Sequence, residues 1–170
     1  DDGKLSLTDI FCYMLELCNI LEILHAHSPA IIHRDIKPSN IIITNYNKAV
    51  LLDFNAAKYY SEQEKDTMLL GTQGYAAPEQ YGFGASSPQT DIYSLGILLK
   101  EMTASVNYSD KKIQAVIQKC TQVDPSGRYQ DVRELRNELT HLTKLPSETG
   151  LSATAPSGFR KYTLPGFRTK

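Results

Sequence analysis

The stretch IIHRDIKPSN, residues 31–40, decides how the rest of this sequence is interpreted. It places Asp35, Lys37 and Asn40 at short fixed intervals in a polar loop that follows a pair of isoleucines. Carboxylate and amide oxygens beside a lysine suit a complex of phosphate with a divalent cation, because Mg2+ prefers oxygen ligands of these kinds. The loop therefore indicates phosphate chemistry.

A β-hairpin is predicted directly after this loop. Residues 41–43 and 50–52 are short apolar runs, and the residues between them, NYNK at 45–48, are typical of a turn. Asp53 follows the second run immediately. The hairpin would therefore bring the carboxylate of Asp53 back toward the polar loop.

The composition is that of a soluble globular protein. The chain has 170 residues, 41% hydrophobic and 22% charged, which fits one domain with a buried core. The net charge of −1 gives no reason to expect nucleic acid as a partner. No apolar run approaches the roughly 20 residues of a membrane span. Cys12, Cys18 and Cys120 form no CxxC pair and are interpreted as buried thiols in a reducing compartment.

Four helices are predicted from the spacing of apolar residues. Residues 5–24 carry apolar side chains at three- and four-residue steps, the pattern of an amphipathic helix. Residues 91–102 are apolar almost all round, which predicts a helix in the centre of the domain. Shorter helices are predicted over 113–120 and 131–142. The fold class is therefore mainly α with a small β-hairpin.

Both ends of the first predicted helix carry signals of their own. Ser6 followed by Asp9 resembles a capping box. Pro29 ends the helix, because it biases the residue before it away from helical geometry. His25 and His27 stand at this end with no carboxylate or cysteine nearby, and we interpret them as a helix-terminal cap rather than as metal ligands.

Two further stretches lack regular periodicity. Residues 54–89 are long for an irregular segment in a compact domain, which indicates a functional role. From residue 145 the composition shifts to Pro, Ser, Thr and Gly, which is typical of a flexible tail. We therefore expect one domain over 1–144 and a flexible tail over 145–170.

Five motifs resemble those of the eukaryotic-like protein kinases, and most of all the bacterial serine/threonine kinases. HRDIKPSN at 33–40 resembles the catalytic loop, LLDFN at 51–55 the metal-binding segment, and GTQGYAAPEQ at 71–80 the strip that contacts the substrate. DIYSLG at 91–96 resembles the start of the long central helix, and DPSGRY at 124–129 the late arginine motif. The resemblance implies the large, C-terminal lobe of a protein-kinase-like fold. Residues 33–40 and 71–80 are called the catalytic loop and the substrate strip below.

The resemblance implies catalytic and cofactor-binding roles. Asp35 would orient the substrate hydroxyl and accept its proton, and Lys37 would contact the γ-phosphate of ATP. Lys37 also favours serine and threonine as the residues modified. Asn40 would complete the catalytic set and, with Asp53, bind Mg2+ or Mn2+. Ile42 would lie against the adenine ring.

The resemblance also implies structural roles. His33 and Phe54 would stack in the apolar column of the lobe, and Asp91 would accept backbone N–H groups from the catalytic loop. Glu79 and Arg128 resemble the buried ion pair that fastens the activation segment.

Regulation is expected to involve the catalytic loop and the irregular segment. Arg34 precedes the catalytic Asp, an arrangement found in kinases that are controlled by phosphorylation of the activation loop, and its guanidinium suits a phosphate. Thr67 is the candidate phosphosite, and Ser61 is its competitor. Thr72 is expected to bond to Asp35 and Lys37 as part of the substrate strip.

The chain also departs from the family pattern. The resemblance covers about residues 5–142, and no GxGxxG is present in the chain, so the small N-terminal lobe that completes the ATP site is expected to be absent. The chain alone is therefore predicted to bind ATP weakly and not to phosphorylate protein. Asn55 stands where the family has Gly, and we expect its tolerance of left-handed φ to keep Asp53 in place. The short interval from 102 to 113 indicates that the substrate-side helix is reduced.

The end of the chain bears on location. LPGFRTK at 164–170 resembles the juxtamembrane linker of membrane-anchored bacterial relatives. A cytoplasmic location is expected, with a membrane reached only through a downstream anchor in a longer parent protein.

Three hypotheses follow. The first is a serine/threonine protein kinase that transfers the γ-phosphate of ATP, represented here by its large lobe. The second is a pseudokinase-like scaffold or protein-interaction module. The third, a small-molecule phosphotransferase of related fold, is disfavoured because the substrate strip and Arg128 serve a segment that docks polypeptides.

Overall fold

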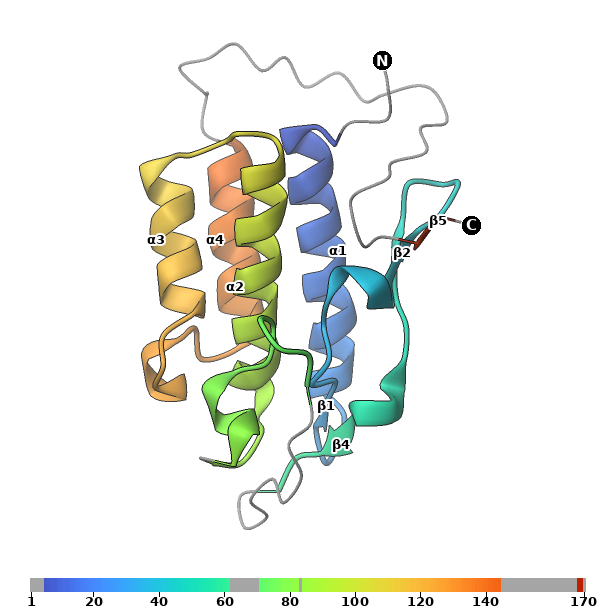
Figure 1. The fold of residues 1–170 in the computed structure, drawn as a ribbon, viewed down its shortest axis with the longest axis vertical. Coiled ribbons are helices and arrows are strands. Elements are labelled where there is room, and N and C mark those ends of the chain that lie inside the picture. Colours follow the sequence, from blue (N-terminus) through green and yellow to red (C-terminus); the bar gives the residue numbers. More distant parts are fainter. Residues whose placement is uncertain (1–4, 62–70, 83, 145–167, 170) are drawn as a thin grey trace.

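The computed structural model describes residues 5–61, 71–82, 84–144 and 168–169, and every structural statement below concerns those residues. Helices make up most of the structure, and a small hairpin lies beside α1 on the side away from α3 (Figure 1). The mainly α class is therefore confirmed. All four predicted helices are present, with ends within three residues of the predicted ones: α1 (Leu7–His25), α2 (Pro88–Ser105), α3 (Lys111–Cys120) and α4 (Val132–Lys144).

The start of α1 is fixed by reciprocal hydrogen bonds between Ser6 and Asp9. The backbone N–H of Asp9 donates to Ser6 Oγ at 3.1 Å, and the backbone N–H of Ser6 donates to Asp9 Oδ2 at 3.0 Å. This arrangement satisfies two of the amides that a helix N-terminus leaves without partners. The predicted capping box is therefore confirmed.

The central helix is α2, which packs against α1, α3 and α4. Its position agrees with the prediction from its apolar surface. Gly96 faces α3, and a Cβ atom built there would lie 2.4 Å from the Cβ of Cys120, far inside contact distance. None of the described helices, α2 included, combines the length and the apolar character that a membrane crossing requires. The inward side chains of α2 are fully buried: Ile92, Leu95, Leu98 and Leu99.

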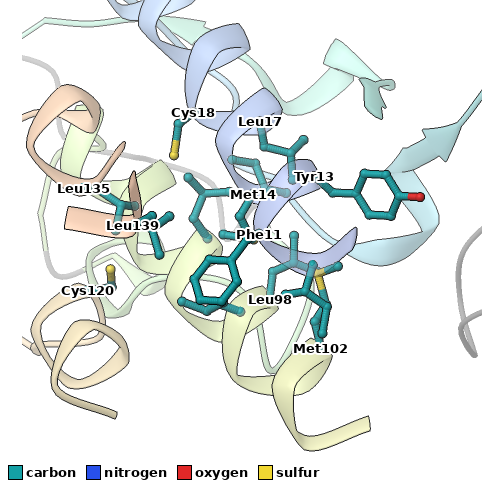
Figure 2. Close-up of a cluster of buried hydrophobic side chains, with 14 of the residues drawn as sticks. Phe11, Tyr13, Met14, Leu17, Cys18, Leu98, Met102, Cys120, Leu135 and Leu139 are labelled. Atoms are coloured by element: carbon teal, nitrogen blue, oxygen red, sulfur yellow. The ribbon is translucent and has the colours of Figure 1, made fainter. Parts of the chain in front are cut away.

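The core lies where these helices meet. Figure 2 shows side chains of α1, α2 and α4 converging, with Met14 of α1 facing Leu139 of α4. Full burial of one such side chain stabilises the fold by about 1.5–3 kcal/mol. Tyr13 belongs to the same core, and its ring extends toward the outer side of α1 (Figure 2). Its hydroxyl donates to Oδ1 of Asn47 in the hairpin turn. The hairpin is therefore tied to the outer side of α1.

The predicted hairpin consists of β2 (Ile41–Ile43) and β3 (Ala49–Leu51), which pair antiparallel. Glu16 of α1 fastens β3, because its carboxylate accepts from the backbone N–H of Ala49 at 2.5 Å. A short strand, β5 (Arg168–Thr169), pairs parallel with β2. The remainder of the predicted flexible tail, 145–167 and 170, lies outside the described residues.

A second small sheet pairs the two chain segments on either side of the candidate site. β1 (Ile31–Ile32) pairs antiparallel with β4 (Lys58–Tyr59). The chain between these strands contains both the catalytic loop and the residues that follow β3. The pairing therefore holds these two segments beside each other.

The cysteine prediction is correct for two residues and wrong for one. All three thiols are free, and Cys18 and Cys120 are buried. Burial raises the pKa of Cys18 to about 12, so this thiol is unreactive at neutral pH. Cys12 is exposed instead of buried. It lies off the stripe of α1 that contains Ile10 and Met14, which turns it toward solvent.

Replacing Gly96 by Ala is expected to destabilise the fold, although Ala favours helix more than Gly does. The added methyl group would overlap α3, and overpacking of this kind costs about 1–3 kcal/mol. Lys100→Ala, at an exposed site of the same helix, should change the free energy of unfolding by less than about 0.5 kcal/mol. Urea denaturation measures both, and a more stable Gly96→Ala variant would contradict the close packing of α2 and α3.

Candidate active site

A buried carboxylate of the central helix holds the catalytic loop. Asp91, fully buried in the first turn of α2, accepts from the backbone N–H of His33 at 2.9 Å and from that of Arg34 at 2.8 Å. These are the bonds that the resemblance implied. Arg34 has a left-handed φ of 69°, which a residue with a side chain adopts only at a cost. The bonds to Asp91 therefore hold the loop in a strained conformation.

Three side chains donate hydrogen bonds to Asp35. Thr72 Oγ1 donates to Oδ1 at 2.7 Å, Lys37 Nζ lies 2.8 Å from Oδ2, and Asn40 Nδ2 lies 2.9 Å from the same oxygen. Lys37 also donates to Thr72 Oγ1 at 2.6 Å. The structure thus brings together the three candidate catalytic residues of the loop and the predicted contact in the substrate strip.

The charge of Asp35 follows from these contacts. Burial of the carboxyl opposes ionisation, but the hydrogen bonds from Lys37, Thr72 and Asn40 outweigh it, so the pKa of Asp35 lies below its ordinary value of 3.8. Asp35 is therefore a carboxylate at neutral pH. A carboxylate in this state can accept a hydrogen bond from a hydroxyl and orient it.

Asn40 and Asp53, the candidate metal ligands, are brought into neighbouring positions by the hairpin. The backbone N–H of Leu52 donates to the carbonyl of Asn40 at 2.8 Å, so Asp53 follows directly beside it. Asn40 uses Nδ2 for its bonds to Asp35, which leaves the amide oxygen out of those bonds. Asp53 is exposed, and its carboxylate accepts from Asn55 N at 3.2 Å. In the described part of the chain these two side chains make no hydrogen bond to each other.

An amide oxygen and a carboxylate fit Mg2+, which takes few protein ligands and completes its shell with phosphate and water oxygens. Over the described residues, no group of three or more His, Cys, Asp and Glu side chains converges on one point. The amide oxygen of Asn40 and the carboxylate of Asp53 suit a magnesium ion that brings phosphate ligands of its own.

The segment after β3 differs from expectation at one residue. Asp53 itself has the left-handed φ, 61°, whereas Asn55 lies in a short 3-10 turn, Phe54–Ala56. The expectation for Asn55 is therefore wrong: its backbone is not left-handed, and its N–H donates to the side chain of Asp53, which caps the turn. His33 and Phe54 are in edge-on contact, with ring centroids 4.8 Å apart, but Phe54 is 47% exposed and lies at the surface.

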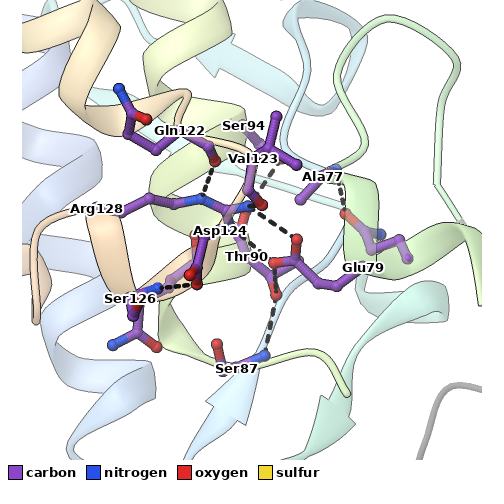
Figure 3. A network of polar contacts seen from close by, with 12 residues as sticks. Ala77, Glu79, Ser87, Thr90, Ser94, Gln122, Val123, Asp124, Ser126 and Arg128 are labelled. Carbon is purple, nitrogen blue, oxygen red and sulfur yellow. Dashed lines mark hydrogen bonds and ion pairs between the residues drawn. The ribbon is translucent and has the colours of Figure 1, made fainter. Parts of the chain in front are cut away.

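The substrate strip is anchored by a buried ion pair (Figure 3). Arg128, 1% exposed, donates to both carboxylate oxygens of Glu79 at 2.7 and 2.9 Å. The hydroxyl of Thr90 donates to the same carboxylate at 2.8 Å. Both charges are therefore compensated inside the protein. The other N–H groups of Arg128 donate to backbone carbonyls of Gln89, Gln122 and Val123.

The remaining predicted residues are placed as follows. Ile42 is half-buried in β2. Arg34 is buried, and its Nε donates to the carbonyl of Ala56 at 2.6 Å. Thr67 lies outside the described residues. The nucleotide-binding and regulatory roles of these three residues stay predictions.

Two residues of the site were missed by the sequence analysis. His25 is more than a helix-terminal cap, because its Nε2 lies 2.9 Å from Oδ2 of Asp91. Gln80, 2% exposed, bonds both to the substrate strip and to the catalytic loop. The available signal for Gln80 was its place beside Glu79 in the strip, and for His25 its place at the end of the helix before the loop.

Comparisons with known proteins show to which family the chain is similar. The model of the protein kinase domain family matches residues 1–148. The serine/threonine-protein kinase PknD of Chlamydia pneumoniae is 31% identical over an aligned length of 195 residues. The alignment covers 88% of this chain and 21% of that protein. A probable serine/threonine-protein kinase of Clostridium acetobutylicum is 31% identical over 171 residues, or 84% of this chain and 26% of that protein. The chain thus spans about a fifth to a quarter of the length of these curated relatives.

Replacing Arg128 by Met should destabilise the protein strongly. The methionine leaves the buried carboxylate of Glu79 without its counter-charge, and breaking a buried pair in this way costs about 3–5 kcal/mol. Arg133→Met is the matched control, because Arg133 is 63% exposed and lies 3.7 Å from Glu22. An exposed pair contributes about 0–1 kcal/mol. Equal effects of the two substitutions in urea denaturation would contradict the assigned role of the buried pair.

The lowered pKa of Asp35 predicts a pH effect on stability. A carboxyl whose pKa falls on folding stabilises the folded state above its unfolded pKa, and this contribution is lost as the pH falls through the folded value. The free energy of unfolding of the wild-type protein should therefore drop relative to that of Asp35→Asn between about pH 5 and pH 3. A difference that stays constant over this range would show that the contacts of Asp35 do not favour its charged form.

Proposed function

The chain belongs to the protein kinase domain family, and on that premise we propose that it is the large-lobe part of an ATP-dependent serine/threonine protein kinase. The activity is transfer of the γ-phosphate of ATP to a serine or threonine hydroxyl of a protein. The observation that carries the proposal is the contact of Asp35 with an aliphatic hydroxyl beside a lysine.

The hydroxyl of Thr72 supports the proposed way in which a substrate is oriented. It is the same chemical group as the proposed phosphate acceptor, and it donates to Asp35 Oδ1 at 2.7 Å. A substrate hydroxyl that donates to the same carboxylate would be oriented by Asp35. Asp35 would accept the proton as the new oxygen–phosphorus bond forms and the bond from the γ-phosphorus to the oxygen of ADP, the leaving group, breaks. Positioning matters more than basicity here, because the transition state of phosphoryl transfer is loose.

The other residues of the cluster have complementary roles. Lys37 holds a positive charge beside Asp35 and would bind the transferred phosphate. Asn40 and Asp53 would hold Mg2+, which neutralises phosphate charge when bound, and Mn2+ fits the same ligands. Ile42 would offer an apolar surface to the adenine ring.

The scaffold hypothesis accounts for less of the structure. A protein-interaction module needs the helical core and the buried Glu79–Arg128 pair, but it has no chemical need for Asp35, Lys37 and Asn40 in one bonded cluster. Thr72 joins that cluster from a segment 37 residues away from Asp35. A contact that brings a distant hydroxyl onto this one carboxylate favours an enzyme.

The partners follow from this proposal. Protein substrates with serine or threonine are proposed, and a small lobe with a glycine-rich loop and an ATP-binding lysine is proposed to complete the nucleotide site. Use of ATP together with the free thiols of Cys12, Cys18 and Cys120 favours the cytoplasm. A membrane would be reached only through a downstream anchor.

Asp35→Asn tests the function in the protein made from the full coding sequence that contains this chain. The substitution keeps the size of the side chain and removes the proton acceptor, so phosphate transfer to a protein substrate should be abolished while the fold is kept. Glu138→Gln, an equivalent change at an exposed site of α4, should leave the transfer rate unchanged. Radiolabelled ATP measures transfer, and an Asp35→Asn enzyme with wild-type turnover would rule out the catalytic assignment.

A further inference from the structure

Gln80, the last residue of the substrate strip, makes two buried hydrogen bonds that the kinase proposal has not used. Its side chain is 2% exposed. Oε1 accepts from the backbone N–H of Ala77 at 2.9 Å, and Nε2 donates to the backbone carbonyl of Arg34 at 2.8 Å. One carboxamide therefore connects the substrate strip to the catalytic loop.

A hydrogen bond to the carbonyl of Arg34 acts on the peptide group that leads into Asp35. A peptide group is planar, so the C=O of Arg34 and the N–H of Asp35 turn together. The two preceding peptide groups are already fixed, because Asp91 accepts from the amides of His33 and Arg34. Gln80 fixes the third, and Asp35 N completes this unit by donating to His33 Nδ1 at 3.3 Å. The peptide group that leads into Asp35 is thus held at its carbonyl by Gln80 and at its N–H by the longer bond to His33.

The start of the strip closes over the same side chain. A Cβ atom built on Gly71 would lie 2.9 Å from Nε2 of Gln80 and 2.6 Å from the Cβ of Ala76. Thr72, the next residue, bonds to the carboxylate of Asp35. The folded strip therefore holds Asp35 from two sides, through the side chain by Thr72 and through the main chain by Gln80.

We propose that Gln80 is a positioning residue for phosphate transfer, which couples the folded state of the substrate strip to the orientation of Asp35. It contacts neither of the reacting groups and acts through the Arg34 carbonyl. The inference rests on the proposed role of Asp35.

Gln80→Glu is the decisive substitution, made in the full-length protein. It keeps the shape of the side chain, removes the N–H donor and places a carboxylate oxygen against the Arg34 carbonyl. The expected result is a fall in kcat on the order of tenfold to a hundredfold, as a misplaced catalytic group produces, with the KM for ATP changed by less than about twofold because the residues proposed to bind ATP are untouched. The matched control is Gln89→Glu, since the side chain of Gln89 is half-buried and its Nε2 donates to the Gln130 carbonyl at 2.8 Å in a solvent-exposed bond. This control should keep the wild-type kcat.

The pH profile separates positioning from a general loss of structure. A buried carboxyl group beside a carbonyl has a raised pKa, and its protonated form donates an O–H bond. The kcat of Gln80→Glu relative to the wild type should therefore rise as the pH is lowered. Gln80→Met has no donor at any pH, so its relative kcat should stay low. A folded Gln80→Met enzyme with wild-type kcat would overturn the proposal, and this variant decides the matter if Gln80→Glu does not fold.

Hydrogen exchange tests the coupling without reference to activity. In the same full-length proteins, the amides of the catalytic loop, Asp35 among them, should exchange faster in Gln80→Met than in the wild type or in Gln89→Glu. Unchanged exchange would overturn the coupling. If the wild type transfers no phosphate but Gln80→Met still exchanges faster, the coupling is supported and the proposed kinase function is rejected. The two failures can therefore be told apart.

Discussion

The structure depends on a carboxylate placed where water cannot reach it. Asp91 lies in the first turn of the helix that packs against all three others, and burying a charge there without partners would cost far more than the fold's net stability. The catalytic loop supplies the partners, because the amides of His33 and Arg34 donate to it, and His25 adds a third contact. These bonds fasten the start of the loop to the first turn of the central helix.

The substrate strip is fixed by the same principle at another place. Glu79 is held by Arg128 and Thr90, which leaves the strip with a buried anchor near its end. From that anchor the strip reaches the loop at two points, Thr72 with Asp35 and Gln80 with Arg34. A polar network that is buried and satisfied in this way is stiff, since breaking one bond leaves its partner without compensation. Two segments distant in the sequence thereby present one carboxylate in a defined direction.

The sequence predicts well those features that repeat or that occur as local motifs. Apolar periodicity is sufficient to predict the four helices and the hairpin, because each of these regular elements buries one face or its whole surface. The cluster around Asp35 follows from the resemblance, since three of its members lie within one short loop. The same signals do not reveal Gln80 or the contact of His25, because a single polar side chain that bonds across the fold leaves no period in the sequence.

The errors at Cys12 and Asn55 have related causes. The apolar pattern correctly predicts the helix that contains Cys12, but Cys12 lies beside its buried stripe and is exposed. Whether such a residue is buried depends on its angle around the helix axis, and the residue type does not determine that angle. Asn55 was expected to take a backbone conformation that the structure gives to Asp53. Both mistakes concern the local orientation of one residue within an element that was correctly placed.

Backbone strain provides an argument about function that is independent of the resemblance. Four non-glycine residues in the described ranges have a left-handed φ, and two of these are asparagines, Asn47 and Asn107, which tolerate it. The other two, Arg34 and Asp53, lie beside Asp35 and within the candidate metal site. Aspartate tolerates this conformation as asparagine does, whereas Arg34 adopts it at a cost on the order of 1–3 kcal/mol. Arg34 is kept in this state by Asp91 and Gln80, and Asp53 by the amide of Asn55. A scaffold gains nothing from strain at Arg34, whereas the proposed enzyme would gain a fixed main chain directly before Asp35.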